Sequence, residues 1–236
     1  MSHILTTGKS LDLLADPVPW APIFNGGYPI LVCDDNTVPR YMESVDGLVD
    51  DRLSATFRDL QYLTSMMNRS GRDGPRIRDV DYQTFFHSIQ YRLLQLRAQL
   101  DNILGECLRL AMLAYLTTTF QIGGQRATYP YLASKFRECC CGIEVSSPLI
   151  GNLKLWFLMV GAITAFDSSE PWLQQSWTSD VPNLSWHEAR YRLNEVMWIG
   201  NLHEMPAKLA FDKLNSYRTD SERSSTSPSE QPPTVT

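Results

Sequence analysis

Residues 106–120 read ECLRLAMLAYLTTTF, and residues 153–172 read LKLWFLMVGAITAFDSSEPW. Both stretches are apolar on too many faces to lie on a protein surface, so we expect two buried helices. The longest near-continuous apolar run, 155–166, is shorter than the roughly 20 residues that a membrane-spanning helix needs. The two stretches therefore predict an all-α domain in which both helices lie at the centre of the core.

Further helices are expected on both sides of this centre. A stripe of large apolar residues recurs at helical spacing between Asp50 and Asn68, and the motif from Ser185 to Glu188 has the spacing of a capping box. Pro206 is expected to open the last helix. The full expectation is about seven to eight helices around one core with no significant sheet. Four helices are expected at 50–68, 102–121, 130–142 and 148–166. The others are expected to begin at Asp81, which would cap its helix, and at Ser169, Ser185 and Pro206.

The two ends of the chain differ in composition from its middle. Residues 1–45 are rich in Pro and Gly and predict an irregular lead-in with a short extended piece at 30–33. After Tyr217 the chain lacks aromatic residues, and such a segment cannot offset its ordering entropy, so 218–236 is expected to be a disordered tail. This leaves 46–217 as one helical domain.

Charge and cysteine usage narrow the functional classes. The net charge is −5 over 236 residues, which argues against a chain that holds a nucleic-acid backbone by itself, because phosphate binding needs a concentrated basic surface. Five cysteines, three of them adjacent at 139–141, form a poor disulfide framework and suit a reducing compartment. The N-terminus lacks the pattern of a secretory signal.

No catalytic, cofactor or metal site is predicted. His187-Glu188 and His203-Glu204 both begin like a zinc-protease motif, but Tyr191 and Ala207 stand where the second histidine is required. The adjacent cysteines at the end of a helix point in different directions, so they do not converge on a tetrahedral metal ion. Four tryptophans remain as candidates for a ligand or interhelix pocket, with core packing as the more frequent explanation: Trp156, Trp172, Trp186 and Trp198.

The order of the apolar segments resembles one family. The segments are Glu106-Cys-Leu-Arg-Leu-Ala111 with Tyr115-Leu116, Leu155-Trp156-Phe157 with Val160-Gly161-Ala162, Pro171-Trp172, Ser185-Trp186-His187-Glu188, and Trp198. This order is similar to that of the fungus-specific transcription factor domain, which lies C-terminal to zinc-cluster DNA-binding modules. The resemblance is strongest over 100–215. Trp172 is followed by Leu173 where the family pattern continues with Phe.

The resemblance implies a non-enzymatic regulatory domain in the nucleus. It would act by contacts with other transcription-regulatory proteins, by pairing with a second copy, or by binding an effector. The family's six-cysteine zinc cluster has no counterpart here, since Cys33 stands alone, so direct DNA contact is not expected. Two alternatives remain open: a helical small-molecule-binding protein or enzyme, and a truncated fragment without independent function.

Overall fold

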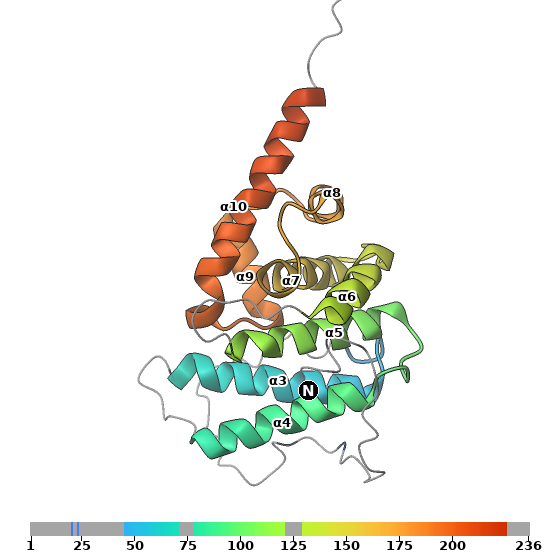
Figure 1. The fold of residues 1–236 in the computed structure, drawn as a ribbon, viewed down its shortest axis with the longest axis vertical. Helices are drawn as coiled ribbons and strands as arrows, with labels where there is room; N and C mark the ends of the chain where they lie inside the picture. The colour runs from blue at the N-terminus through green and yellow to red at the C-terminus, as the bar shows by residue number, and fades with distance from the viewer. Residues whose placement is uncertain (1–19, 21–22, 24–44, 71–77, 121–128, 226–236) are drawn as a thin grey trace, which may run out of the picture.

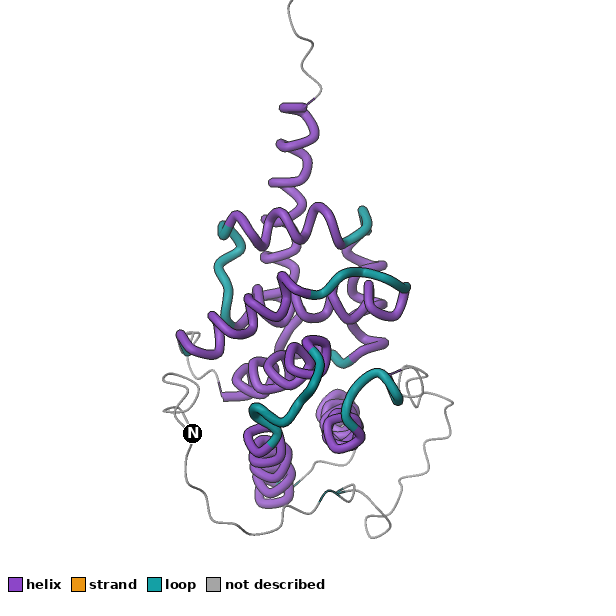
Figure 2. The backbone as a smooth tube through the Cα atoms, turned by 90° about the vertical axis from the view of Figure 1, so that its right-hand side faces the viewer, coloured by secondary structure: helices purple, strands orange, loops and turns teal. Residues whose placement is uncertain are grey.

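The computed structural model describes Trp20, Ile23 and residues 45–70, 78–120 and 129–225. These residues form eight α-helices and no β-strand (Figure 1, Figure 2), which confirms the predicted all-α class. The elements are α3 (Asp51–Ser70), α4 (Asp79–Gln95), α5 (Ile103–Thr117) with a 3-10 turn η1 (Thr118–Phe120), α6 (Pro130–Gly142), α7 (Pro148–Thr164), α8 (Pro171–Asp180), α9 (Trp186–Val196) and α10 (Gly200–Ser225).

The two apolar stretches form the centre of the core, as predicted. Helix α5 buries every residue from 107 to 116, and α7 buries every residue from 153 to 164. Helix α5 packs on α6 and α7, while α7 also contacts α8, α9 and α10. Both helices begin at a capping side chain: Asn102 accepts from the N–H of Gly105, and Ser147 accepts from that of Ile150.

The remaining helices lie at the two ends of this centre. Helices α3 and α4 run side by side at one end, and α8, α9 and α10 lie toward the other (Figure 1). A buried ion pair joins the first two helices: Arg92 Nη1 lies 2.8 Å from Asp59 Oδ2, and both side chains are 3% exposed. The predicted capping box of α9 is present, because Ser185 and Glu188 exchange hydrogen bonds.

Helix α10 differs from the prediction at its start. It begins at Gly200 rather than Pro206, and Pro206 lies inside it. The turn before the proline closes on Ile199, whose carbonyl accepts from the N–H groups of Leu202 and His203. A proline removes the hydrogen bond to the carbonyl four residues earlier, here that of Leu202, whose residue is 41% exposed and therefore open to water.

The end of α10 also lies later than expected. The helix continues to Ser225, past the predicted boundary at Tyr217, and extends beyond the body in two perpendicular views (Figure 1, Figure 2). Arg218 explains the continuation, because its guanidinium is buried against the end of α8 and donates to the carbonyl of Val181 at 2.8 Å. Residues 226–236 of the predicted tail lie outside the described residues.

One smaller expectation also changes, and others fall on residues that the structure does not describe. Asp81 does not cap α4: the helix begins at Asp79, and Asp81 lies in its first turn, where it accepts from Arg78 Nη2 at 2.9 Å. Most of the predicted lead-in, including the extended piece at 30–33, lies outside the described residues. Within the lead-in, the N–H of Ile23 donates to Asp59 at 3.1 Å.

Candidate functional site

Two of the four candidate tryptophans lie inside the core. Trp156 is fully buried, and its Nε1 donates to the carbonyl of Met197 at 2.7 Å. The rings of Tyr115 and His203 lie between it and the second tryptophan, Trp198. The ring centroids are 5.8 Å apart for Trp156 and Tyr115, 4.8 Å for Tyr115 and His203, and 4.6 Å for His203 and Trp198. These aromatic side chains pack α5, α7 and the start of α10 together, which is the core-packing role.

His203 belongs to a continuous series of hydrogen bonds in this part of the core. The N–H of Ile199 donates to His203 Nδ1 at 3.2 Å, and Nε2 lies 2.8 Å from Oγ1 of Thr118. Thr118 in turn donates to the carbonyl of Tyr115 at 2.7 Å. Because Nδ1 must accept, Nε2 carries the proton, and the neutral imidazole satisfies both of its nitrogens. Burial lowers the pKa of His203 to about 3, so at neutral pH the imidazole is uncharged and its role is to hold the fold together.

The other two tryptophans lie at separate places near the surface. Trp172 packs edge-on against Phe166 at 4.7 Å between centroids, and Trp186 packs against Phe211 at 5.2 Å. Trp177, which the prediction did not name, is fully buried, and its ring also packs against Phe211, at 5.7 Å between centroids. The candidates therefore do not converge on one pocket.

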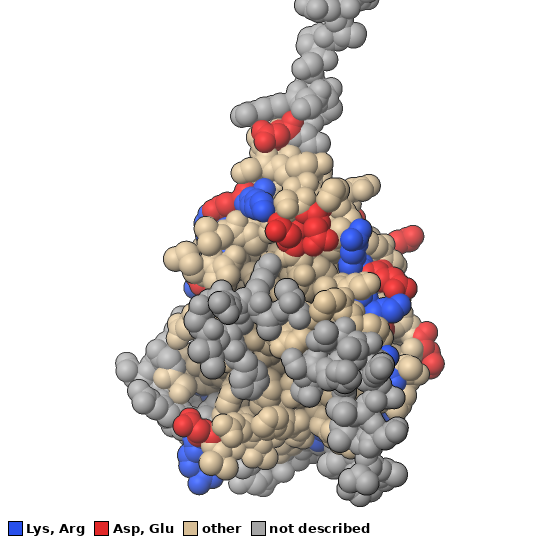
Figure 3. Space-filling model, in the orientation of Figure 1, with Lys and Arg blue, Asp and Glu red and all other residues tan. Residues whose placement is uncertain are grey.

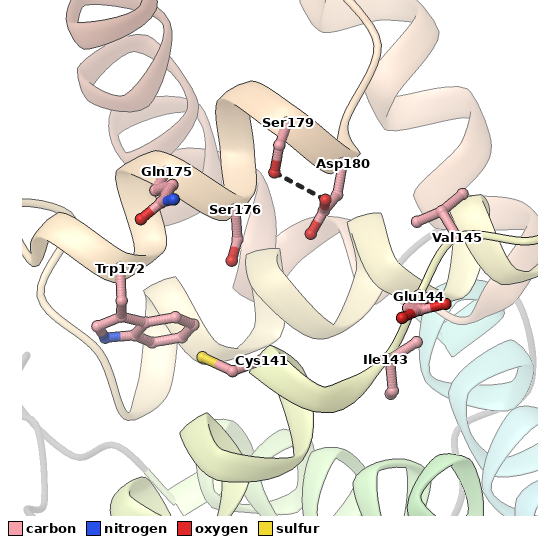
Figure 4. A pocket seen from close by; sticks show the side chains of 9 residues that line it. All are labelled: Cys141, Ile143, Glu144, Val145, Trp172, Gln175, Ser176, Ser179 and Asp180. Carbon is pink, nitrogen blue, oxygen red and sulfur yellow. Dashed lines mark hydrogen bonds between the residues drawn. The ribbon is translucent and has the colours of Figure 1, made fainter.

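Trp172 does line a cavity of about 640 Å³ between α8 and the end of α6. One face of α8 supplies five lining residues at helical spacing, and residues 141 and 143–145 supply the opposite wall (Figure 4). Ser176 and Asp180 point from α8 into the space, and the indole of Trp172 and the thiol of Cys141 point toward one another. The volume lies within the range of small-molecule sites.

A buried lysine holds one wall of this cavity in place. Lys154 of α7 is 1% exposed, and its Nζ donates to the carbonyls of Cys140 and Ile143 where α6 ends. The same Nζ lies 3.1 Å from Oδ2 of Asp180, the last residue of α8. One cation thus neutralises the negative ends of two helix dipoles and ties α6, α7 and α8 together.

The cysteines do not form a reactive centre. As expected for successive helix positions, Cys139 and Cys140 are buried while Cys141 is exposed. Cys140 Sγ lies 3.7 Å from Cys107 Sγ on α5, inside the core. Burial raises the pKa of the Cys141 thiol, which disfavours the nucleophilic thiolate. No group of three or more potential metal ligands occurs among the described residues.

The surface charges are of mixed sign. On the face shown in Figure 3, acidic and basic side chains alternate around α8 and α10, and no single-sign patch is visible among the described residues. The described helices include none that is long and apolar enough to cross a bilayer.

The prediction missed three features that matter here: Lys154, His203 and the polar face of α8. Lys154 stands out in the sequence as the one charged residue before a long apolar run. The α8 face is visible as polar residues three and four positions apart beside Leu173 and Trp177. Most partners of His203 and Lys154 could not be read from the sequence, because Thr118, Cys140 and Asp180 lie on other elements; only Ile199 is close to His203 in the chain.

Comparisons of the chain with protein-family models, with curated proteins and with solved structures found no match.

Proposed function

We propose that this chain is the non-enzymatic regulatory domain of a fungal transcription regulator. It acts in the nucleus through contacts with other regulatory proteins or a second copy, and through an effector. The observation that carries the proposal is the order of the family-like segments, which fall on α5, α7, α8 and α9 in turn. The proposal rests on that resemblance.

Contacts between these segments are consistent with the proposal. The tryptophan of the Leu155-Trp156-Phe157 segment donates to the carbonyl of the residue before Trp198, which joins two segments of the resemblance at 2.7 Å. In the Glu106–Ala111 segment, Arg109 is buried, pairs with Glu106 and donates to the carbonyl of Leu93 at 3.0 Å. Buried polar groups that are fully paired give a core its specific packing.

A reporter assay tests this function. The full chain, fused to an unrelated DNA-binding module in a fungal cell, is expected to change transcription of a reporter severalfold in either direction. Leu110→Asp, which places a charge in the core, is the loss-of-fold control. A fusion that is folded, nuclear and without effect on the reporter contradicts the proposal.

DNA binding provides a second test. The purified chain alone is expected to bind duplex DNA weakly and with a steep loss of affinity as salt is raised, because the chain has a net charge of −5 and the face in Figure 3 shows no basic patch among the described residues. A sequence-specific complex that stays tight at physiological salt would show that this chain reads DNA itself.

A further inference from the structure

The cavity between α8 and the end of α6 has a preformed aromatic wall. Trp172 is fixed by its edge-to-face contact with Phe166 and by a 2.7 Å hydrogen bond from Nε1 to Glu170 Oε2. The guanidinium of Arg137 already lies 5.4 Å from the centre of this ring. An indole is the side chain that attracts cations best, through the negative potential of its face.

The charge of the cavity is negative. Two carboxylates line it, on Glu144 and Asp180, and none of the lining residues is Lys, Arg or His. Helices α6 and α8 both end at the cavity, where Lys154 neutralises the negative ends of their dipoles. Two cations offset part of the negative charge: Lys154 pairs with Oδ2 of Asp180, and the guanidinium of Arg137 lies over the ring of Trp172. The charge on Glu144 is left without an ion-pair partner among the described residues.

The lining also offers polar groups that the fold does not use. The hydroxyl of Ser176 and the amide of Gln175 make no hydrogen bond to any described residue, and neither does the carboxylate of Glu144. Asp180, by contrast, is anchored by Lys154 and by the hydroxyl of Ser179 at 2.7 Å. The cavity thus combines one fixed carboxylate with several groups free to accept from a ligand.

We propose that this cavity binds a small organic cation, a primary ammonium group on a short carbon chain. The ammonium lies between the carboxylates of Asp180 and Glu144, and Ser176 accepts one of its protons. The carbon chain runs along the indole of Trp172. Anions of the same size are excluded by the two carboxylates. As an effector site the cavity rests on the regulatory function proposed above, but binding itself is measured without a reporter.

Three compounds with the same four-carbon chain test the proposal. Calorimetry on the full chain at low salt compares 1,4-diaminobutane, 1,4-butanediol and succinate, which differ in charge. The diamine is expected to bind saturably and about tenfold more tightly than the other two, because only it pairs with the carboxylates. Its binding should shift the indole N–H resonance that Trp172→Phe removes.

Matched variants locate the site. Glu144→Gln and Ser176→Ala are expected to weaken diamine binding by about three- to fivefold each, the effect of one exposed ion pair or hydrogen bond. Glu138→Gln, on an exposed carboxylate of α6 that does not line the cavity, should leave binding unchanged. Thermal melts check that all three variants remain folded.

Other results would overturn the proposal. They are equal affinity for the diol or succinate, diamine binding that both cavity variants leave intact, or no saturation at all. The reporter separates this outcome from that of the regulatory function. Diamine binding by a chain that never alters transcription keeps the site and removes the function, and a transcriptional effect without diamine binding does the reverse.

Discussion

His203 accepts a hydrogen bond at Nδ1 from the backbone N–H of Ile199, 3.2 Å away, at the start of α10. Its other nitrogen is paired with Thr118 at the end of α5. A second proton on the ring would place two donors against each other at Nδ1. The fold therefore holds this histidine neutral, and that requirement links stability to pH.

Acidification is expected to destabilise the chain through His203. Burial lowers its pKa in the fold to about 3 from an ordinary 6.5, so between these values the unfolded state binds a proton that the folded state does not. The contribution of the neutral His203 to the free energy of unfolding is complete above pH 6.5. Below that pH it falls by about 1.4 kcal/mol for each pH unit, down to about pH 3. Urea titrations between pH 7.5 and 4.5 measure the slope.

Two histidine variants isolate this effect from that of the carboxylates. His203→Gln should reduce the pH slope of the unfolding free energy, whereas His187→Gln, on the exposed side of α9, should keep it. An unchanged slope in the His203 variant would mean that the imidazole is not held neutral.

Lys154→Met should destabilise the chain by about 2–4 kcal/mol. The change removes a buried ammonium and leaves the carbonyls of Cys140 and Ile143 and the carboxylate of Asp180 without their donor. The exposed pair of Lys135 and Glu138 supplies the control, since Lys135→Met should leave the free energy of unfolding nearly unchanged. Chemical denaturation of both variants measures the difference, and equal costs would contradict the role given to Lys154.

Leu110→Asp should unfold the domain, because Leu110 is 2% exposed on α5 and an aspartate there buries an unpaired charge. Ile103→Asp on the same helix is the matched control. Ile103 is 45% exposed in the first turn, where a negative charge favours the helix dipole. Circular dichroism and thermal melts compare them, and a cooperative transition at the parental temperature for Leu110→Asp would be incompatible with a buried α5.

Two glycines of α7 should respond oppositely to alanine. At Gly161 a Cβ would lie 2.1 Å from the ring of Phe166, which is buried and packs on Trp172, so Gly161→Ala should cost about 1–3 kcal/mol. At Gly151 the nearest atom is a methyl of Val145 at 3.4 Å. Gly151→Ala should be neutral or stabilise by up to about 1 kcal/mol through helix propensity. Melting temperatures of the two variants test this difference. A higher melting temperature for Gly161→Ala would contradict the close packing of Phe166 on Gly161.

The sequence was most informative for features that depend on residues within a single helix. Residues 107–116 and 153–164 carry no polar face, so the burial of their apolar side chains follows from composition alone, whereas the burial of Arg109 and Lys154 does not. The Ser185–Glu188 capping box was equally visible because both partners lie within one turn. The expected start of α10 at Pro206 was wrong, because a contact between Ile199 and His203 stabilises the preceding turn.

The sequence by itself determined that this chain is an all-α domain built around two apolar helices, because helical periodicity is a local property of neighbouring residues. The tertiary structure alone decided that Lys154 of α7 and Asp180 meet 3.1 Å apart where α6 and α8 end, and that Trp172 but not Trp156 lines a cavity. Residues far apart in the chain come together only when the helices pack, and no pattern within either helix records that contact.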